Sequence, residues 1–197
     1  MGEHSFPHQH VILNDGTRIP IRPIQPDDAD ALQRFHLGLS AYSIYLRHVH
    51  ALPRLTEDQL KYFTQLDGVY RFAIVALDPN APVDIIAVVR YEGSPGSDRA
   101  EYAALVTDSW QGKGLGSAMT RSLIGAALQR GIRHFFALVL PENIRMMSLL
   151  RDLGYPERMR FEDGIAEIDV DLTQPPPDID QDSSDREAET VESPIRH

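Results

Sequence analysis

The sequence predicts an α/β protein in which one mixed β-sheet is flanked by helices. Short apolar stretches rich in β-branched residues alternate along the chain with longer segments of helical periodicity. Three strand-like stretches between residues 72 and 107 follow one another with no helix between them, which indicates a mixed rather than a purely parallel sheet. A glycine-rich loop then joins the last of these stretches to a long run of helix-forming residues.

Local signals mark where the elements begin and end. Asn14-Asp15-Gly16 indicates the turn of a hairpin. Asp27-Asp28 and the capping box at Thr56–Gln59 each begin a helix, and Gly131 and Gly154 end the last two helices. The expected elements are, in order, strands at 11–13 and 17–22, helices at about 27–39 and 56–66, strands at 72–77, 85–91 and 102–107, a helix at 115–130, a strand at 134–140, a helix at 143–153, and strands at about 159–161 and 165–171.

Length and composition favour a single folded domain. A chain of 197 residues with 42% hydrophobic residues is long enough to bury a core. It contains no cysteine, so disulfides, cysteine-based zinc sites and a thiol nucleophile are excluded. No apolar run approaches 18 residues and the polar start does not suit a secretory signal, so we expect a cytoplasmic protein with no membrane partner.

Charge divides the chain into three parts. The net charge is −10, and residues 174–197 contribute seven acids against two arginines in a proline-rich segment that we expect to be disordered. Residues 1–10 are expected to be an unstructured lead-in, and we expect no metal site at His4, His8 and His10. Residues 11–173 form the predicted domain. A net-acidic chain argues against nucleic-acid binding.

The loop in "VTDSWQGKGLGSAMTRSLIGAAL", residues 106–128, holds three glycines in five positions. It is not a P-loop, because Lys113 precedes Gly114 and Leu115 rather than a serine or threonine. It is not the G-x-G-x-x-G dinucleotide fingerprint, because Ser117 stands where the last glycine belongs. Unpaired N–H groups at the start of a helix favour phosphate, so Gln111–Ser117 is predicted to hold a pyrophosphate. The alternative is that the glycines only turn the chain.

The pattern Gln111, two residues, Gly114-Leu115-Gly116 resembles the Q/R-x-x-G-x-G/A loop of the GNAT family of N-acetyltransferases. "VLPENIRMMSLLRDLGY", residues 139–155, is similar to the strand, asparagine, helix and Gly-aromatic segment of that family. "DRAEYAALVTDSWQGKGLG", residues 98–116, resembles the GNAT domain of bacterial protein-lysine acetyltransferases. The resemblance covers the predicted domain from end to end and implies the GNAT acyl-CoA N-acyltransferase fold.

The resemblance implies that acetyl-CoA is the co-substrate and that no metal is needed. Asn143 would lie near the pantetheine arm, although an asparagine here is also a good helix N-cap. Backbone N–H groups near Leu105 and Val106 are candidate donors to the oxyanion. The residues expected to contact acetyl-CoA are Leu105, Val106, Thr107, Gln111, Gly112, Lys113, Gly114, Leu115, Gly116, Ser117 and Asn143.

The resemblance assigns Glu101 as the general base. A lysine amine has a reference pKa of about 10.4 and is mostly protonated in water, so a nearby carboxylate is needed to draw off a proton. The alternative is that Glu101 is an exposed carboxylate at the end of a strand. Many GNAT enzymes carry a tyrosine, proposed as general acid, where this chain has Leu150. Leu150 shares an apolar helical face with other residues and is expected in the core, so the general acid is unassigned.

The predicted reaction is acetyl transfer by direct attack of a primary amine, with a protein lysine as the expected acceptor. Tyr42, Tyr45 and Arg47 are candidates to shape acceptor binding, and the alternative for them is packing at the surface. His48 and His50 are expected to line a loop before the second helix rather than to bind metal. Two alternatives stay open: an enzyme for small amines, and a non-catalytic acyl-CoA sensor. A nucleotide-binding switch is a further possibility, and the chain is expected to be a monomer or a homodimer.

Overall fold

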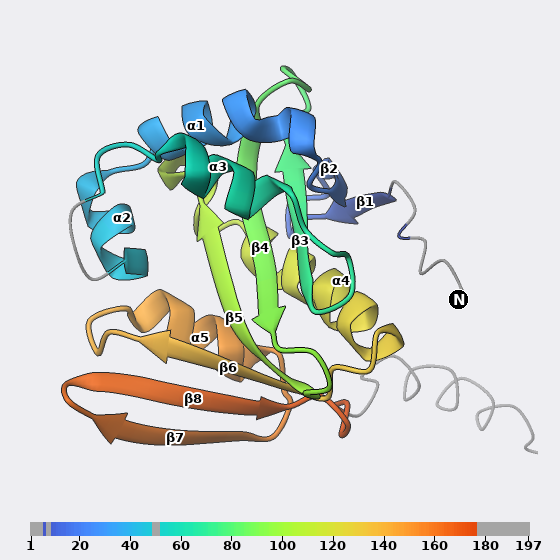
Figure 1. Ribbon diagram of the computed structural model, residues 1–197, viewed down its shortest axis with the longest axis vertical. Helices are drawn as coiled ribbons and strands as arrows, with labels where there is room; N and C mark the ends of the chain where they lie inside the picture. Colours follow the sequence, from blue (N-terminus) through green and yellow to red (C-terminus); the bar gives the residue numbers. More distant parts are fainter. Residues whose placement is uncertain (1–5, 7–8, 49–51, 177–197) are drawn as a thin grey trace, which may run out of the picture.

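The computed structural model describes Phe6, residues 9–48 and residues 52–176 of the chain. Within these residues eight strands form one sheet in the order β1-β2-β3-β4-β5-β6-β8-β7 (Figure 1). Every neighbouring pair is antiparallel except β5 and β6, which are parallel, so the predicted mixed sheet is confirmed. The strands are β1 (Gln9–Ile12), β2 (Arg18–Pro23), β3 (Arg71–Leu77), β4 (Ile85–Gly93), β5 (Arg99–Val106), β6 (His134–Val139), β7 (Glu157–Glu162) and β8 (Ile165–Asp171).

Helices cover both faces of the sheet (Figure 1). Alternation along the strands sends Ile74 and Val89 to one face, where they pack in a core with α4, and Val75 and Val88 to the other, where they pack against α1. The helices are η1 (Pro26–Asp28), α1 (Ala29–Leu37), α2 (Ala41–His48), α3 (Glu57–Thr64), η2 (Asp108–Trp110), α4 (Leu115–Gln129) and α5 (Ile144–Asp152). The described helices include none that is both long and apolar enough to cross a bilayer.

The parallel contact between β5 and β6 is short. The two strands pair only over Arg99–Glu101 and His134–Phe136. Arg99 fixes this junction: it donates to Glu167 at 2.8 Å and Asp169 at 2.9 Å. Beyond Glu101, β5 stays paired with β4 through Val106, while β6 pairs with β8. The second half of β5 therefore has one edge that does not pair with β6.

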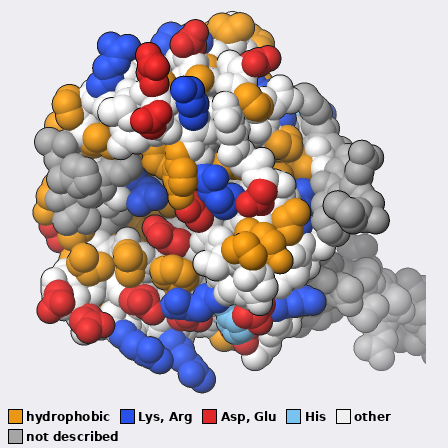
Figure 2. Space-filling view, viewed as in Figure 1, with side chains coloured by type: hydrophobic (Ala, Val, Ile, Leu, Met, Phe, Trp, Pro, Cys, Tyr) orange, Lys and Arg blue, Asp and Glu red, His pale blue; other side chains and the backbone are white. Residues whose placement is uncertain are grey.

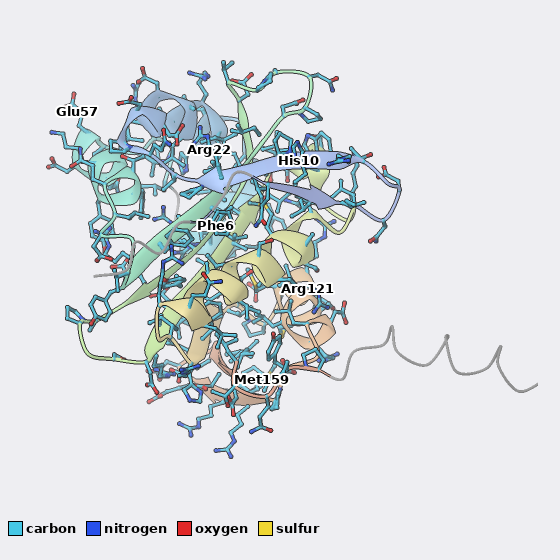
Figure 3. All side chains as sticks on the ribbon, turned by 90° about the vertical axis from the view of Figure 1, so that its right-hand side faces the viewer. Phe6, His10, Arg22, Glu57, Arg121 and Met159 are labelled. Atoms are coloured by element: carbon cyan, nitrogen blue, oxygen red, sulfur yellow. The ribbon has the colours of Figure 1, made fainter. Side chains whose placement is uncertain are left out.

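Helices α4 and α5 are held together at their ends. Arg121 of α4, labelled in Figure 3, donates to the carbonyl oxygens of Asp152 at 3.1 Å and Leu153 at 3.2 Å. These carbonyls lie at the end of α5, where the helix leaves its last acceptors without intrahelical partners. The arginine therefore both caps α5 and fixes its position against α4.

Two expectations from the sequence differ from the structure. The prediction of a loop through His48 is wrong, because residues 41–48 form α2, with Ser40 as its N-cap accepting from the Ser43 N–H at 3.1 Å. The expected unstructured lead-in is shorter than 1–10, because β1 begins at Gln9 and the Phe6 ring lies 5.8 Å from that of Phe72 (Figure 3). The predicted disorder after Gln174 falls mainly on residues 177–197, outside the described residues, as do His4, His8 and His50.

We expect Tyr102→Phe to lower the free energy of unfolding by about 1–2 kcal/mol, because it leaves a buried acceptor unpaired. The Thr120 hydroxyl donates to the Gly116 carbonyl at 2.7 Å, so the Tyr102 hydroxyl, 2.7 Å from Thr120 Oγ1, is the donor in that contact. Urea denaturation measures the change. Tyr45→Phe is the control, since its hydroxyl is exposed and 3.4 Å from its partner, and an equal loss there would contradict the prediction.

We expect Asp28→Asn to cost roughly 2 kcal/mol at neutral pH. Both carboxylate oxygens of Asp28 accept from Arg22, at 2.6 and 2.7 Å, and one also accepts from the Gln25 N–H at 2.7 Å. Burial alone would raise the pKa of Asp28, but these bonds outweigh it and lower that pKa below its usual value. The stability that the carboxylate adds is therefore present above about pH 4 and is lost as the pH falls through the lowered value. Urea titrations of both proteins at several pH values should show the difference shrinking in acid, and a constant difference would contradict this.

Candidate functional site

The glycine loop leads into α4, whose first three backbone N–H groups have no intrahelical partner. Gly114 is the N-cap, in the left-handed conformation at φ +84°, and it has no side chain to cap the helix. The first intrahelical bond runs from the Ala118 N–H to the Gly114 carbonyl at 3.0 Å. The N–H groups of Leu115, Gly116 and Ser117 precede that bond, at the positive end of the helix dipole. Such an end binds anions.

Two of the glycines have close side-chain neighbours that would have to shift to admit a Cβ. A Cβ on Gly114 would lie 2.9 Å from Asn14 Oδ1, in the β1–β2 turn, and the positive φ adds strain for any other residue. A Cβ on Gly116 would lie 2.9 Å from Leu149 Cδ1 on α5. Gly112 also has a positive φ, +73°, but open space around it. The loop thus keeps its backbone close to both the hairpin and α5.

Gln111 holds the loop in place with its side chain. Its Nε2 donates to the Val106 carbonyl at 2.9 Å and lies 3.3 Å from Ser43 Oγ on α2. Its Oε1 accepts from Arg145 of α5. The predicted cofactor residue therefore joins the end of β5 to two helices, and its backbone N–H turns back to the Asp108 carbonyl at 3.4 Å.

Asp108 is a residue that the sequence analysis missed. Its carboxylate accepts from the Ser40 N–H at 2.9 Å and from the hydroxyls of Ser40 at 3.0 Å and Ser43 at 2.9 Å. Burial alone would raise the pKa of Asp108, but these hydrogen bonds outweigh it and keep that pKa below its usual value. Asp108 therefore fastens the start of α2 to the loop. No local pattern in the sequence joins two segments so far apart.

The two candidate oxyanion donors on β5 point in different directions. Thr107 donates its N–H to the Ile86 carbonyl at 2.9 Å, on the β4 side. Because N–H groups alternate along an antiparallel strand, Leu105 also directs its N–H to β4, and Val106 directs its N–H to the other edge. Val106 is the better placed of the two. Thr107 Oγ1 is buried with no hydrogen-bond partner.

Glu101 lies near the start of β5, on the face covered by α2. It pairs in register with Glu92 of β4, its side chain is 39% exposed, and its Oε1 is 3.9 Å from Arg47 Nη1. Five residues of extended strand separate it from Val106, roughly 16 Å. The carboxylate therefore sits one strand length from the loop, accessible to solvent.

Helix α2 connects the two ends of this site. Ser40 and Ser43 contact Asp108 at the loop, and Arg47 contacts Glu101 at the far end, so α2 runs beside β5 in the opposite direction (Figure 1). Tyr42 and Tyr45 are exposed on α2. The Tyr45 hydroxyl lies 3.4 Å from Glu142, in the turn between β6 and α5. The three candidate acceptor residues are thus on one helix, of which Arg47 adjoins the candidate base.

The remaining candidates have local structural roles. Asn143 caps α5, accepting from the Met146 N–H at 3.1 Å. The Lys113 ammonium lies 4.7 Å from the centroid of a Trp110 ring. Leu150 is buried in the core, as expected. Among the described residues, no group of three or more histidine or acidic side chains is placed to hold a metal ion.

Comparison with known proteins identifies the family. The family model described as "Acetyltransferase (GNAT) domain" matches residues 18–156. The chain belongs to the GNAT family of acetyltransferases. It is therefore an acyltransferase, and enzymes of this family use acetyl-CoA.

Several relatives are similar over most of the chain. Acetyltransferase Pat of Mycolicibacterium smegmatis is 30% identical over 170 residues, which are 85% of this chain and 49% of the relative. Acetyltransferase PA5475 of Pseudomonas aeruginosa is 26% identical over 144 residues, 73% of this chain and 77% of the relative. The GNAT domain of S. lividans PAT has a TM-score of 0.78 and 35% identity, covering 85% of this chain and 99% of that structure. The chain spans about half the length of Pat.

We expect Gly114→Ala to lower the free energy of unfolding by about 1–2 kcal/mol, since it combines a positive φ with a contact at 2.9 Å. Gly125→Ala is the matched control on the same helix: its Cβ meets nothing within 4 Å, and helical alanine should stabilise by about 0.5–1 kcal/mol. Thermal unfolding of the two variants measures whether each substitution lowers or raises the stability. A neutral Gly114→Ala would show that the loop tolerates a side chain.

Proposed function

We propose that the protein transfers the acetyl group of acetyl-CoA to a protein lysine by direct attack, with Glu101 as general base. The observation that carries the proposal is the arrangement along β5. A cradle of uncapped N–H groups at the start of α4 follows one end of the strand, and an accessible carboxylate lies near the other.

The residues present fit the co-substrate. The N–H groups of Leu115–Ser117 and the bare backbone of Gly112 and Gly114 suit a diphosphate, which needs donors and close backbone approach. The unpaired edge of β5 offers the Val106 N–H, which would bind and polarise a thioester carbonyl. Bound acetyl-CoA supplies an activated acyl group with a thiolate leaving group, whose reference pKa of about 8.5 makes it tolerable without a dedicated acid.

Glu101 would remove the proton from the amine. Among the described residues its one ion-pair partner is Arg47, which at 3.9 Å is too far for a hydrogen bond, so both carboxylate oxygens can accept from the substrate. The carboxylate would take the amine proton directly or through one water molecule.

The names of the relatives and the exposure of Glu101 support a protein lysine as the acceptor. Two of the similar proteins carry the name Pat or PAT. Glu101 is accessible on its face of the molecule, and Tyr42 and Tyr45 are exposed on α2, the helix whose Arg47 adjoins Glu101. An exposed base suits an acceptor that approaches on a protein loop. Incubation of the protein with [¹⁴C]acetyl-CoA and either a proteome extract or a panel of small amines tests this choice. Label restricted to small amines would overturn the lysine assignment.

We expect Glu101→Gln to lower kcat/KM by about 10²–10⁴-fold, because general-base catalysis contributes that much. The dissociation constant for acetyl-CoA, measured by calorimetry, should stay within about threefold, since the residue does not belong to the phosphate cradle. Glu92→Gln is the matched control: that carboxylate is directly opposite Glu101 on the same face, and it already accepts from Tyr62.

The pair of variants also separates the alternatives. A large loss of kcat/KM in Glu92→Gln, with none in Glu101→Gln, would indicate that Glu92 on β4 is the general base. Acetyl-CoA binding without turnover in the wild type would indicate a sensor rather than an enzyme, and tight ATP or GTP binding would indicate a nucleotide switch.

A further inference from the structure

A pocket that the proposed reaction does not use lies between the sheet and α1–α3. It is an open pocket over β4 and β5 that adjoins the site through Arg47 and Leu105. Figure 2 shows acidic and basic side chains side by side at the middle of this face. Most of the lining is apolar, from Leu32, Phe35, Leu55, Phe63, Val88 and Leu105.

Two guanidinium groups line this apolar pocket. Arg90 lies in the middle of β4, opposite Ala103. Arg47 lines the same pocket from α2. Arg90 donates to the Phe63 carbonyl at 2.8 Å and lies 4.5 Å from the centroid of the Phe63 ring. Burial lowers the pKa of Arg90 to about 10, with the charge of Arg47 as a second cause. Two like charges thus share a poorly solvated space.

The surrounding carboxylates do not balance the cations. Among the described residues of this cluster, Arg47, Arg71 and Arg90 carry three positive charges, and Glu92 and Glu101 carry two negative ones. Glu92 is already engaged by the Tyr62 hydroxyl and lies 3.8 Å from Arg71. The cluster is therefore left one anion short. Arg90 has the Phe63 carbonyl and ring as partners but no ion pair among the described residues, so an anion beside this buried cation would be favourable.

Resting on the proposed acyl transfer, we propose that this pocket binds a carboxylate carried by one of the two substrates, held between Arg90 and Arg47. The two N–H donors of a guanidinium edge match a carboxylate, and the apolar walls match the methylene groups that link it to the reacting centre. The carboxylate belongs either to the far end of a dicarboxylic acyl group on coenzyme A or to the amine acceptor.

The chemistry of transfer is unchanged by this group. The amine nitrogen forms the C–N bond with the thioester carbon, the C–S bond breaks, and Glu101 takes a proton from the amine. The thiolate leaves and is protonated by solvent. The bound carboxylate takes no part in these bonds, so it selects the substrate and does not react. Acetyl transfer to an acceptor without a carboxylate would leave Arg90 with no ion-pair partner in the described part of the chain, and Arg47 with Glu101 alone.

The test uses the full chain and two substrate comparisons. The first compares succinyl-CoA with acetyl-CoA on one uncharged lysine peptide. The second compares an acceptor peptide carrying glutamate beside its lysine with the uncharged peptide, both with acetyl-CoA. We expect at least a tenfold preference in kcat/KM for the carboxylate-bearing substrate in one comparison, and that comparison identifies the source.

Arg90→Gln should lower this preference at least tenfold. Its kcat/KM for acetyl transfer to the uncharged peptide should stay within about threefold of the wild-type value. Glutamine keeps a donor for the Phe63 carbonyl and loses the charge. Arg90→Met is the second variant, and thermal unfolding shows which of them is folded. Arg71→Gln is the matched control, because it removes an equal charge from the cluster but does not line the pocket, so its preference should remain.

A binding measurement without turnover separates this inference from the proposed function. Glutarate at millimolar concentration should raise the Tm of the wild type and of Arg71→Gln, and leave that of the folded Arg90 variant unchanged. If the wild type transfers no acyl group, the proposed function fails. The shift in Tm still shows whether the pocket binds a carboxylate. No preference in either comparison, a preference that survives in Arg90→Gln, or a glutarate shift independent of Arg90 would each overturn the carboxylate site.

Discussion

The site depends on how little of β5 pairs with β6. The two strands share three residues each, and the ion pairs of Arg99 with Glu167 and Asp169 hold them at that point. The Arg99 guanidinium also lies 3.9 Å from the centroid of the Phe136 ring, which ties the junction to β6 itself. Since β6 then follows β8 instead, β5 carries one paired and one unpaired edge towards the glycine loop. A strand paired on both edges would have no N–H to offer a substrate.

Helix α2 contacts the candidate site at both ends of β5. At one end Asp108 accepts three hydrogen bonds from Ser40 and Ser43, and at the other Arg47 approaches Glu101. Gln111 joins the same Ser43 to the last carbonyl of β5. These hydrogen bonds tie the loop, the helix and the strand together, and the spacing between the proposed phosphate cradle and the Glu101 carboxylate is set by the length of β5. This spacing does not rely on any single long-range contact.

The sequence predicted the features that depend on interactions between residues close together in the chain. It did not predict those that depend on distant residues. The capping box at Thr56, the turn at Asn14–Gly16 and the glycines ending α4 and α5 act over a few residues, and all of them are confirmed. Helix α2 was missed because its N-cap is fixed by Asp108, 68 residues away. Arg90 was missed because an arginine within an apolar run gives no sign of facing a pocket. The resemblance to the family pointed to Glu101 and the loop as candidates, but it did not predict helix α2, which contacts both.

Arg47 lies between the proposed base, Glu101, and the pocket, and its charge acts on both. A guanidinium near the reacting amine disfavours the ammonium form, so on the proposed mechanism it lowers the pKa of the acceptor and increases the fraction able to attack. The same charge repels Arg90 across the pocket, and Glu101 at 3.9 Å compensates it only in part. A substrate carboxylate would relieve that repulsion where the substrate itself is held. Binding energy would then be gained beside the base, without engaging the two oxygens that must accept the proton.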